Sequence, residues 1–260
     1  MKDLFWKLQP YLSGGLIGWL AFWPPAFTES WGLWRYVVMG SLAGLTFLGT
    51  TILTVLQSLP KELPLQPLGQ PLHDPQVQSL AESLYLLGFR QVSEPLHVGM
   101  KPPAVLVAFM HRDQPAWATI FRTGTLPAKV GFDVFTTLQG GKGGLTTLNN
   151  PAGAVMQAAP GTLRQVFPGA PPEQIFSEHC ATLVQLQQRG LALDRPVPSG
   201  LAESFHRSIS RQREAFLRSP LRNTMKMLWH IMARDSPHFG PLLGQRSTEG
   251  QIRHLLARRT

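Results

Sequence analysis

Residues 130–148 read VGFDVFTTLQGGKGGLTTL, and this stretch decides the fold that we predict. Val130, Phe132 and Val134 alternate with other residues, as in a β-strand that buries one face. A glycine-rich turn follows, and Leu145–Leu148 (LTTL) mirrors the end of the first strand. The stretch therefore predicts two antiparallel strands joined by a turn.

Two further strand-like segments precede this pair. Ala104–Met110 (AVLVAFM) is continuously apolar, as in a buried strand, and Ala116–Arg122 (AWATIFR) follows it. The simplest arrangement is an antiparallel meander of four strands. A fifth strand around Gln91–His97 would extend it.

Two helices are expected to flank this sheet. Asp74 can cap the first, Pro75 suits its first turn and Gly88 ends it. The second covers Pro172–Arg189 and is closed by Gly190. We therefore predict an α+β fold for a soluble domain of residues 74–200.

The turn at Gly140–Gly144 is not a phosphate-binding loop. Such a loop requires Gly-x-x-x-x-Gly-Lys-Ser/Thr opening a helix, whereas Lys142 is followed by Gly143 and then by a strand pattern. The turn is better interpreted as a flexible hairpin tip. The sequence thus predicts no nucleotide site here.

The sequence shows no pattern for catalysis, metal binding or cofactor binding. His179 and Cys180 are neighbours on a helix and point about 100° apart, so they cannot form a thiol–imidazole pair. The histidines have no metal-ligand spacing. We expect no cofactor. An alternative is a membrane-bound enzyme, such as a hydrolase, whose site assembles in space around His111, Asp113, Asp133 and His179.

Two segments near the amino terminus lack charged residues: Leu8–Thr28 and Tyr36–Pro60. A bilayer core needs about 20 apolar residues in helical form. We therefore predict a two-helix transmembrane hairpin over residues 1–59, with a first helix from about Leu4 to Trp23. A cleaved signal peptide or a single span are the alternatives, although no small-x-small cleavage site follows the first segment.

Each predicted span carries two glycines four residues apart. Small residues at this spacing let helices approach closely, either each other or another membrane protein. Basic residues are more frequent at the outer ends of the hairpin than in its loop, which favours both termini in the cytoplasm and a multi-pass protein of the inner (plasma) membrane. The glycine pairs are Gly14 with Gly18 and Gly40 with Gly44.

The formal net charge of +9 is concentrated at one end of the chain. Residues 1–59 and 60–200, the latter including a proline-rich spacer at 60–73, carry +1 each. Residues 201–260 carry +7 and have helical apolar stripes interrupted at Ser219-Pro220. A basic amphipathic helix suits an anionic bilayer surface. Alternatively, the stripe packs on the sheet and the arginines are solvated.

The expected partners of this basic tail are anionic lipid head groups or a membrane protein complex, and nucleic acid is disfavoured because no nucleic-acid-binding module is visible. We hypothesise a membrane-anchored, non-enzymatic accessory, docking or scaffold protein. The residues expected to contact lipid or a partner are Arg207, Arg211, Arg213, Arg218, Arg222, Lys226, Trp229, Arg253, Arg258 and Arg259.

Overall fold

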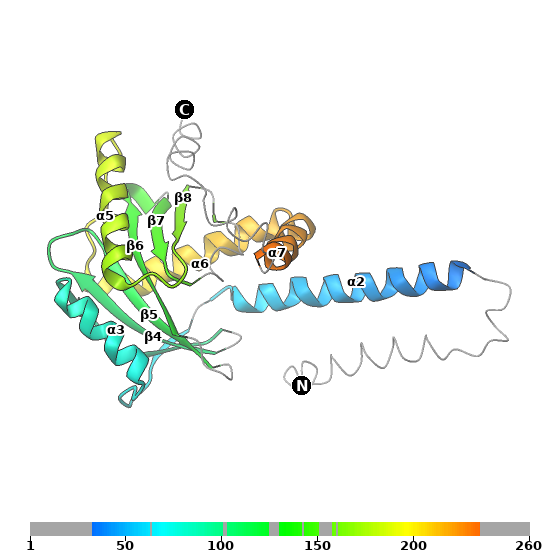
Figure 1. Cartoon of the computed structure of the whole chain (residues 1–260), viewed down its shortest axis with the longest axis horizontal. Helices are drawn as coiled ribbons and strands as arrows, with labels where there is room; N and C mark the ends of the chain where they lie inside the picture. The colour runs from blue at the N-terminus through cyan, green and yellow to red at the C-terminus, as the bar shows by residue number, and fades with distance from the viewer. Residues whose placement is uncertain are drawn as a thin grey trace. The chain divides into compact units, whose positions relative to one another are not determined.

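The computed structural model describes residues 33–62, 64–100, 103–124, 130–141, 143–150, 158–159 and 161–234. The chain divides into two units, 1–55 and 56–260. Within the described residues the fold is mixed α+β, with a large, mostly antiparallel sheet and five helices (Figure 1).

The sheet has eight strands in the order β1-β3-β4-β5-β6-β7-β8, and β2 pairs with β4 beside β3. All pairs are antiparallel except β7 with β8. The strands are β1 (Leu65–Pro67), β2 (Phe89–Gln91), β3 (Leu96–Val98), β4 (Ala104–His111), β5 (Trp117–Thr123), β6 (Val130–Leu138), β7 (Gly143–Leu148) and β8 (Thr162–Val166).

The four strands predicted from the sequence correspond to β4, β5, β6 and β7, but the sheet is larger than expected. The segment predicted as a fifth strand, Gln91–His97, contains the end of one three-residue strand, β2, and the start of another, β3, with a connection between them. β1 lies inside the predicted spacer 60–73 and pairs with β3. β8 was missed because the sequence around it is rich in proline and glycine.

Both predicted flanking helices are confirmed. α3 (Pro75–Leu86) is capped by Asp74, whose carboxylate accepts hydrogen bonds from the amides of Gln76 (3.0 Å) and Val77 (3.3 Å). This cap satisfies amide groups that have no partner inside the helix. α5 (Pro172–Gln188) is followed by Gly190, which has a positive φ of 76°.

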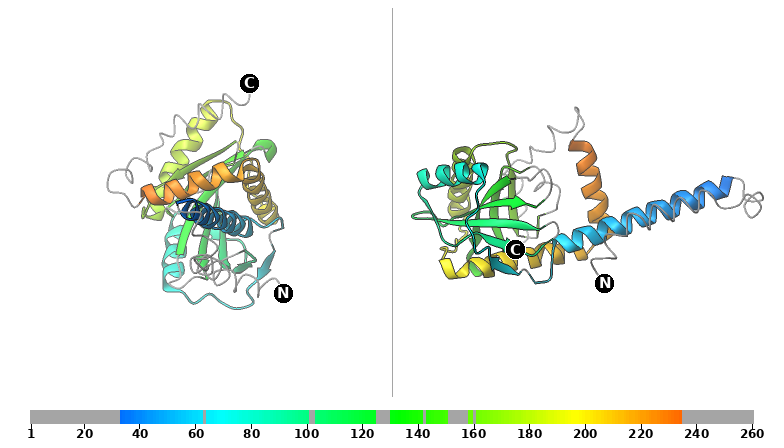
Figure 2. Two further views of the ribbon diagram at one scale, coloured as in Figure 1. Left: turned by 90° about the vertical axis from the view of Figure 1, so that its right-hand side faces the viewer. Right: turned by 90° about the horizontal axis from the view of Figure 1, so that it is seen from below.

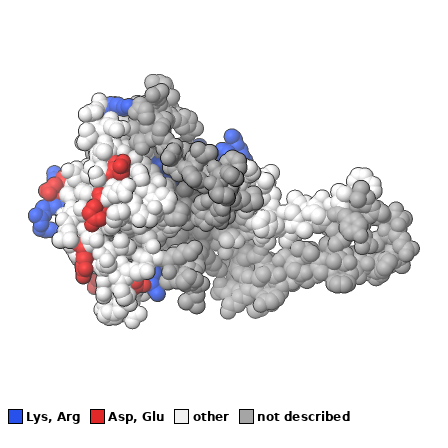
Figure 3. Space-filling model, viewed as in Figure 1, with Lys and Arg blue, Asp and Glu red and all other residues white. Residues whose placement is uncertain are grey.

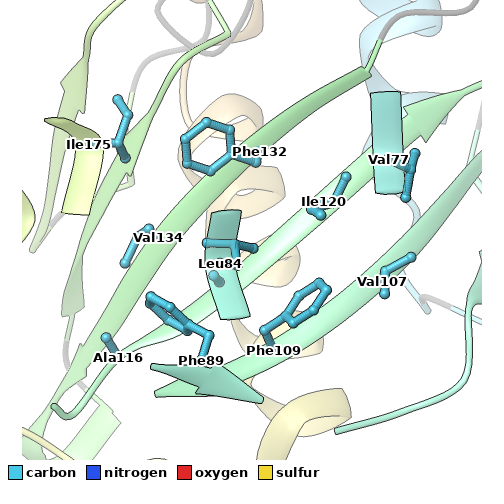
Figure 4. Close-up of a cluster of buried hydrophobic side chains, with 11 residues drawn as sticks. Val77, Leu84, Phe89, Val107, Phe109, Ala116, Ile120, Phe132, Val134 and Ile175 are labelled. Atoms are coloured by element: carbon cyan, nitrogen blue, oxygen red, sulfur yellow. The ribbon is translucent and has the colours of Figure 1, made fainter. Parts of the chain in front are cut away.

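The main core lies between one face of the sheet and the two helices α3 and α5. Figure 4 shows Leu84 of α3 among side chains from β2, β4, β5 and β6. Alternate strand residues supply this face, which is the periodicity of a strand half-buried on one side. The buried members are Val77, Leu84, Phe89, Val107, Phe109, Ala116, Ala118, Ile120, Phe132, Val134 and Ile175.

α6 (Leu201–Leu217) covers part of the opposite face of the sheet (Figure 2). Leu201 is buried there with Trp117 of β5, and Phe205 packs edge-to-face on Phe135 of β6 at 5.4 Å between ring centroids. The short 3₁₀ turn η4 (Pro198–Gly200) precedes α6, and α7 (Pro220–Arg234) follows it. The alternative in which the basic segment packs on the sheet is therefore correct for the first part of α6.

The glycine-rich turn after β6 leads into a close backbone approach at Gly143. It begins with the 3₁₀ turn η3 (Gln139–Gly141), in which Gly140 has a positive φ of 73°. β7 starts at Gly143, where an added Cβ would lie 2.0 Å from the carbonyl oxygen of Gly161. Glycine is required at position 143 because the backbone before β8 occupies the space of a side chain.

α2 (Leu33–Ser58) contains the one segment of the described residues with the length and composition to cross a membrane, 40–58. Nineteen helical residues extend about 28 Å, close to the thickness of a hydrocarbon core. Large apolar side chains on it are exposed, among them Leu45 (66%) and Phe47 (59%). The first predicted span, with Gly14 and Gly18, lies outside the described residues.

Four threonine hydroxyl groups of α2 bond to carbonyl groups of the same helix. Thr46, Thr51 and Thr54 each donate a hydrogen bond of 2.8 Å to the carbonyl four residues earlier, and Thr50 donates to the carbonyl three residues earlier. In hydrocarbon a polar group has no water to bond, so this internal pairing suits a membrane environment.

Candidate functional site

His179 of α5 is fully buried and has a hydrogen-bond partner at each ring nitrogen. Nε2 lies 2.9 Å from Oγ1 of Thr136 on β6, and Nδ1 lies 2.9 Å from Oγ1 of Thr147 on β7. Both threonines are buried as well. Burial lowers the pKa of His179 to about 3, because the charged imidazolium would lose its hydration. His179 is therefore neutral near pH 7.

Each of the two threonines also bonds to a group beyond the ring. Thr136 donates its hydroxyl proton to the carbonyl of Pro115 at 2.6 Å. Thr147 donates to Oε1 of Gln165 at 2.9 Å. The tautomer of His179 decides which ring nitrogen donates to its threonine.

This chain of hydrogen bonds continues from the Gln165 amide to the hydroxyl of Thr182 on α5, also at 2.9 Å. The network thus joins β6, β7, β8 and α5 through groups that all lie inside the protein. His179 joins helix to sheet, and its ring nitrogens have no lone pair or proton left for a substrate. Sequence reasoning missed the threonines and Gln165, because their alternation with apolar residues resembles an ordinary strand.

His111, at the end of β4, is also held by its neighbours. Nε2 lies 2.9 Å from the carbonyl of Leu87 after α3, and Nδ1 accepts from the backbone amides of Asp113 (3.0 Å) and Gln114 (2.9 Å). Burial lowers the pKa of His111. The imidazole ring stacks on the ring of Phe176, with 4.9 Å between the ring centroids. These contacts fix the Nε2–H tautomer and fasten the β4–β5 turn to the end of α3.

Asp133 lies on the other face of the sheet. Its sequence neighbours Phe132 and Val134 belong to the core between the sheet and α3 and α5, so the side chain of Asp133 points away from that core. Thr119 of β5 donates a hydrogen bond to Asp133 Oδ1, and Arg164 of β8 is a charge partner. Burial raises the pKa of Asp133 to about 6 despite these two stabilising contacts.

Four side chains were candidates for an enzyme site, and only His111 and Asp113 lie near each other in the structure. Asp113 lies beside His111, but its backbone makes the contact. His179 is enclosed by threonines, and Asp133 is on the opposite face. Burial raises the pKa of the Cys180 thiol, which disfavours a reactive thiolate. No group of three metal-ligating side chains occurs among the described residues.

One open groove lies away from all of these residues. It is lined by residues 69–71 and 91–95, has a volume of about 660 Å³, and is bordered by the loops after β1 and β2. Ser93 Oγ is buried beside it and has no hydrogen-bond partner among the described residues. None of the candidate catalytic side chains reaches this groove.

The residues expected to contact lipid or a partner have different environments. Arg218, Arg222 and Lys226 are exposed, and Trp229 is 59% exposed. Arg207 is exposed beside Glu203 at 3.7 Å, whereas Arg211 and Arg213 are half-buried. Three predicted contact residues lie outside the described residues: Arg253, Arg258 and Arg259.

Arg213 is used inside the protein, which the sequence did not reveal. Its Nη1 donates hydrogen bonds to the carbonyls of Leu59 (2.7 Å) and Leu56 (3.3 Å) at the end of α2. The last carbonyls of a helix have no partner within it, so Arg213 serves as a cap from α6. One nitrogen of the Arg213 guanidinium is therefore engaged within the protein.

Replacing Arg213 by alanine should lower the free energy of unfolding by about 1–3 kcal/mol, because charged hydrogen bonds to two half-buried carbonyls are lost. Thermal unfolding of the full chain in detergent would measure this loss. Arg207→Ala is the matched control, since an exposed ion pair contributes less than about 1 kcal/mol. Equal effects of the two substitutions would contradict the capping role.

Comparison with protein-family models, with curated proteins and with solved structures gives no match for this chain. A functional conclusion therefore depends on the geometry described above.

Proposed function

We propose that this chain is a membrane-anchored, non-enzymatic accessory, docking or scaffold protein. α2 carries the proposal, because its apolar side chains are exposed while its threonine hydroxyls bond to the helix itself. A helix of this kind is poorly suited to water and well suited to hydrocarbon. The basic tail would contact anionic lipid or a membrane partner.

The finer arrangement belongs to the same proposal. α2 would be the second helix of a two-span hairpin in the inner (plasma) membrane, with both termini in the cytoplasm. The antiparallel strands β4 to β7 would act as a meander that forms the platform of the soluble domain. Gly40 and Gly44 would be contact points in the membrane, since an added Cβ at either would meet no atom within 4 Å.

The non-enzymatic part of the proposal is supported by the hydrogen bonds that the candidate catalytic residues make within the protein. Both ring nitrogens of His111 and of His179 are engaged in holding elements together. Asp133 is paired with Thr119 on another face. Among the described residues, no observation favours the alternative of a membrane-bound enzyme built around these side chains.

Site-specific crosslinking in the native membrane tests this function. A photoreactive amino acid at Leu86 (89% exposed) or Val184 (50% exposed) would sample the apolar surface of α3 and α5. We expect each to yield a reproducible crosslinked product of the same partner, and the whole chain to remain in the membrane after alkaline extraction.

Glu82, an exposed polar residue of α3, is the matched position for background crosslinking. If neither of the two apolar positions yields a crosslinked product, the docking role is contradicted. Release of the chain by alkaline extraction would contradict the anchor. The two results are independent of each other.

A further inference from the structure

α7 presents an apolar stripe to the outside of the domain. Leu221, Met225 and Trp229 are spaced four residues apart and are 55%, 55% and 59% exposed. Residues at this spacing lie along one side of a helix. Burying such side chains is favourable, so a stripe of three large apolar side chains indicates a surface with a binding partner.

Exposed cations border this stripe. Arg222 and Lys226 each follow a stripe residue directly, and Arg218 precedes α7. The sequence contains no acidic residue from Ala215 to Arg234. In contrast, the visible acidic side chains in Figure 3 lie largely over α3 and α5. The face around the stripe is therefore complementary to a negatively charged surface.

The direction of this face is fixed by the corner between α6 and α7. The side-chain amide of Asn223 donates to the carbonyls of Ala215 (3.0 Å) and Phe216 (3.1 Å), the last carbonyls of α6. Thr224, the next residue, is fully buried. Because these residues hold the inner side of α7, the stripe and its cations must face outward.

We infer that α7 lies in the surface of an anionic phospholipid bilayer, with the stripe among the acyl chains and the cations at the head groups. The inference deepens the proposed function, on which it rests, by naming the partner of the basic segment. A tryptophan between apolar residues and cations suits the interface between head groups and hydrocarbon. The proposed anchor would keep the helix close to such a surface at all times.

The charge and the apolar stripe make separate contributions. Each basic residue near an anionic surface strengthens binding about fivefold, so Arg222 and Lys226 together account for about 25-fold. This part falls with salt, because charges further apart than a Debye length are screened. The stripe supplies the part that salt does not remove. A protein partner buried against the stripe would show no dependence on the lipid charge.

The test uses the full chain reconstituted into vesicles, with Cys180 replaced by serine and a spin label at Met225→Cys. We expect the label to be shielded from water-soluble relaxing agents in vesicles with 30% anionic lipid and to be exposed in neutral vesicles. Arg222→Gln together with Lys226→Gln should shift this equilibrium about 25-fold toward the exposed state. A label at Val184→Cys on α5 is the control and should stay exposed in both.

Two outcomes would overturn the inference. A label at position 225 that remains in water with anionic vesicles would mean that the helix is solvated. Equal shielding in neutral and anionic vesicles would mean that the stripe is covered without any contribution from the lipid charge. Flotation of the chain with neutral vesicles separates the two proposals: loss of flotation contradicts the anchor, whereas an exposed label on a floating chain contradicts the role of α7 alone.

Discussion

Replacing Gly143 by alanine is expected to lower the free energy of unfolding by about 3 kcal/mol or more. A Cβ at this position would lie 2.0 Å from the carbonyl oxygen of Gly161 and 2.7 Å from its carbonyl carbon. Both are backbone atoms, so no side chain can rotate away. The strain would separate the start of β8 from β7, where Gly144 donates a hydrogen bond of 3.3 Å to the same carbonyl.

Thermal unfolding of the full chain in detergent measures this effect. For a domain of about 200 residues, 3 kcal/mol corresponds to a decrease in Tm of about 6–12 °C. Gly200→Ala is the control, because a Cβ there would meet only the Cγ2 atom of Val197 at 3.3 Å. A decrease in Tm at position 143 no larger than that at position 200 would contradict the close approach of β7 and β8.

The sequence predicted the elements that carry their own signals. α3 and α5 have prolines at their starts and glycines after their ends, β4 is a run of apolar residues, and β6 alternates between buried and less buried residues. These signals depend only on neighbouring residues, so they can be recognised in a single sequence. β1 and β3 were missed or misplaced because three-residue strands are too short to show a period.

The close packing at Gly143 illustrates what local patterns leave out. A glycine-rich turn suggests flexibility, and nothing near it in the sequence indicates that β8 will lie parallel to β7. The space available to a side chain depends on this distant segment. The turn was therefore located correctly, and the close approach of Gly161 to Gly143 was missed.

The orientation of the basic helix α7 could not be predicted from the sequence for the same reason. The sequence identifies a basic, amphipathic helix at 220–234, but helical periodicity alone does not say which side faces inward. Asn223 and Thr224 decide this through contacts with α6 and the domain. Likewise, nothing in the sequence distinguishes Arg213 from the other cations of the tail. Its role follows from its hydrogen bond to the carbonyl of Leu59, which only the structure shows.

Acidification should destabilise the protein through His179, and its replacement by leucine should remove this effect. The native pKa is about 3, compared with 6.5 for an exposed histidine. Between these two pKa values, the unfolded chain binds a proton at His179 and the native protein does not. The stabilising contribution is fully present above about pH 7.5 and is lost as the pH falls toward 3, by about 3 kcal/mol between pH 8 and pH 4.

The measurement compares Tm against pH for the native chain and His179→Leu. At pH 8 the native chain should be more stable by about 2–3 kcal/mol, because the variant lacks two buried hydrogen bonds. At pH 4 this advantage should have disappeared. Asp133, whose raised pKa of about 6 acts in the opposite direction on acidification, is present in both chains and cancels in the difference.

His206 of α6 provides the matched control, since it is an exposed histidine. His206→Gln should reproduce the pH dependence of the native chain. Parallel curves for the native chain and His179→Leu would mean that His179 takes up a proton in the folded state. Because a protonated ring would place a charge in the dry interior, we expect the curves to converge toward low pH instead.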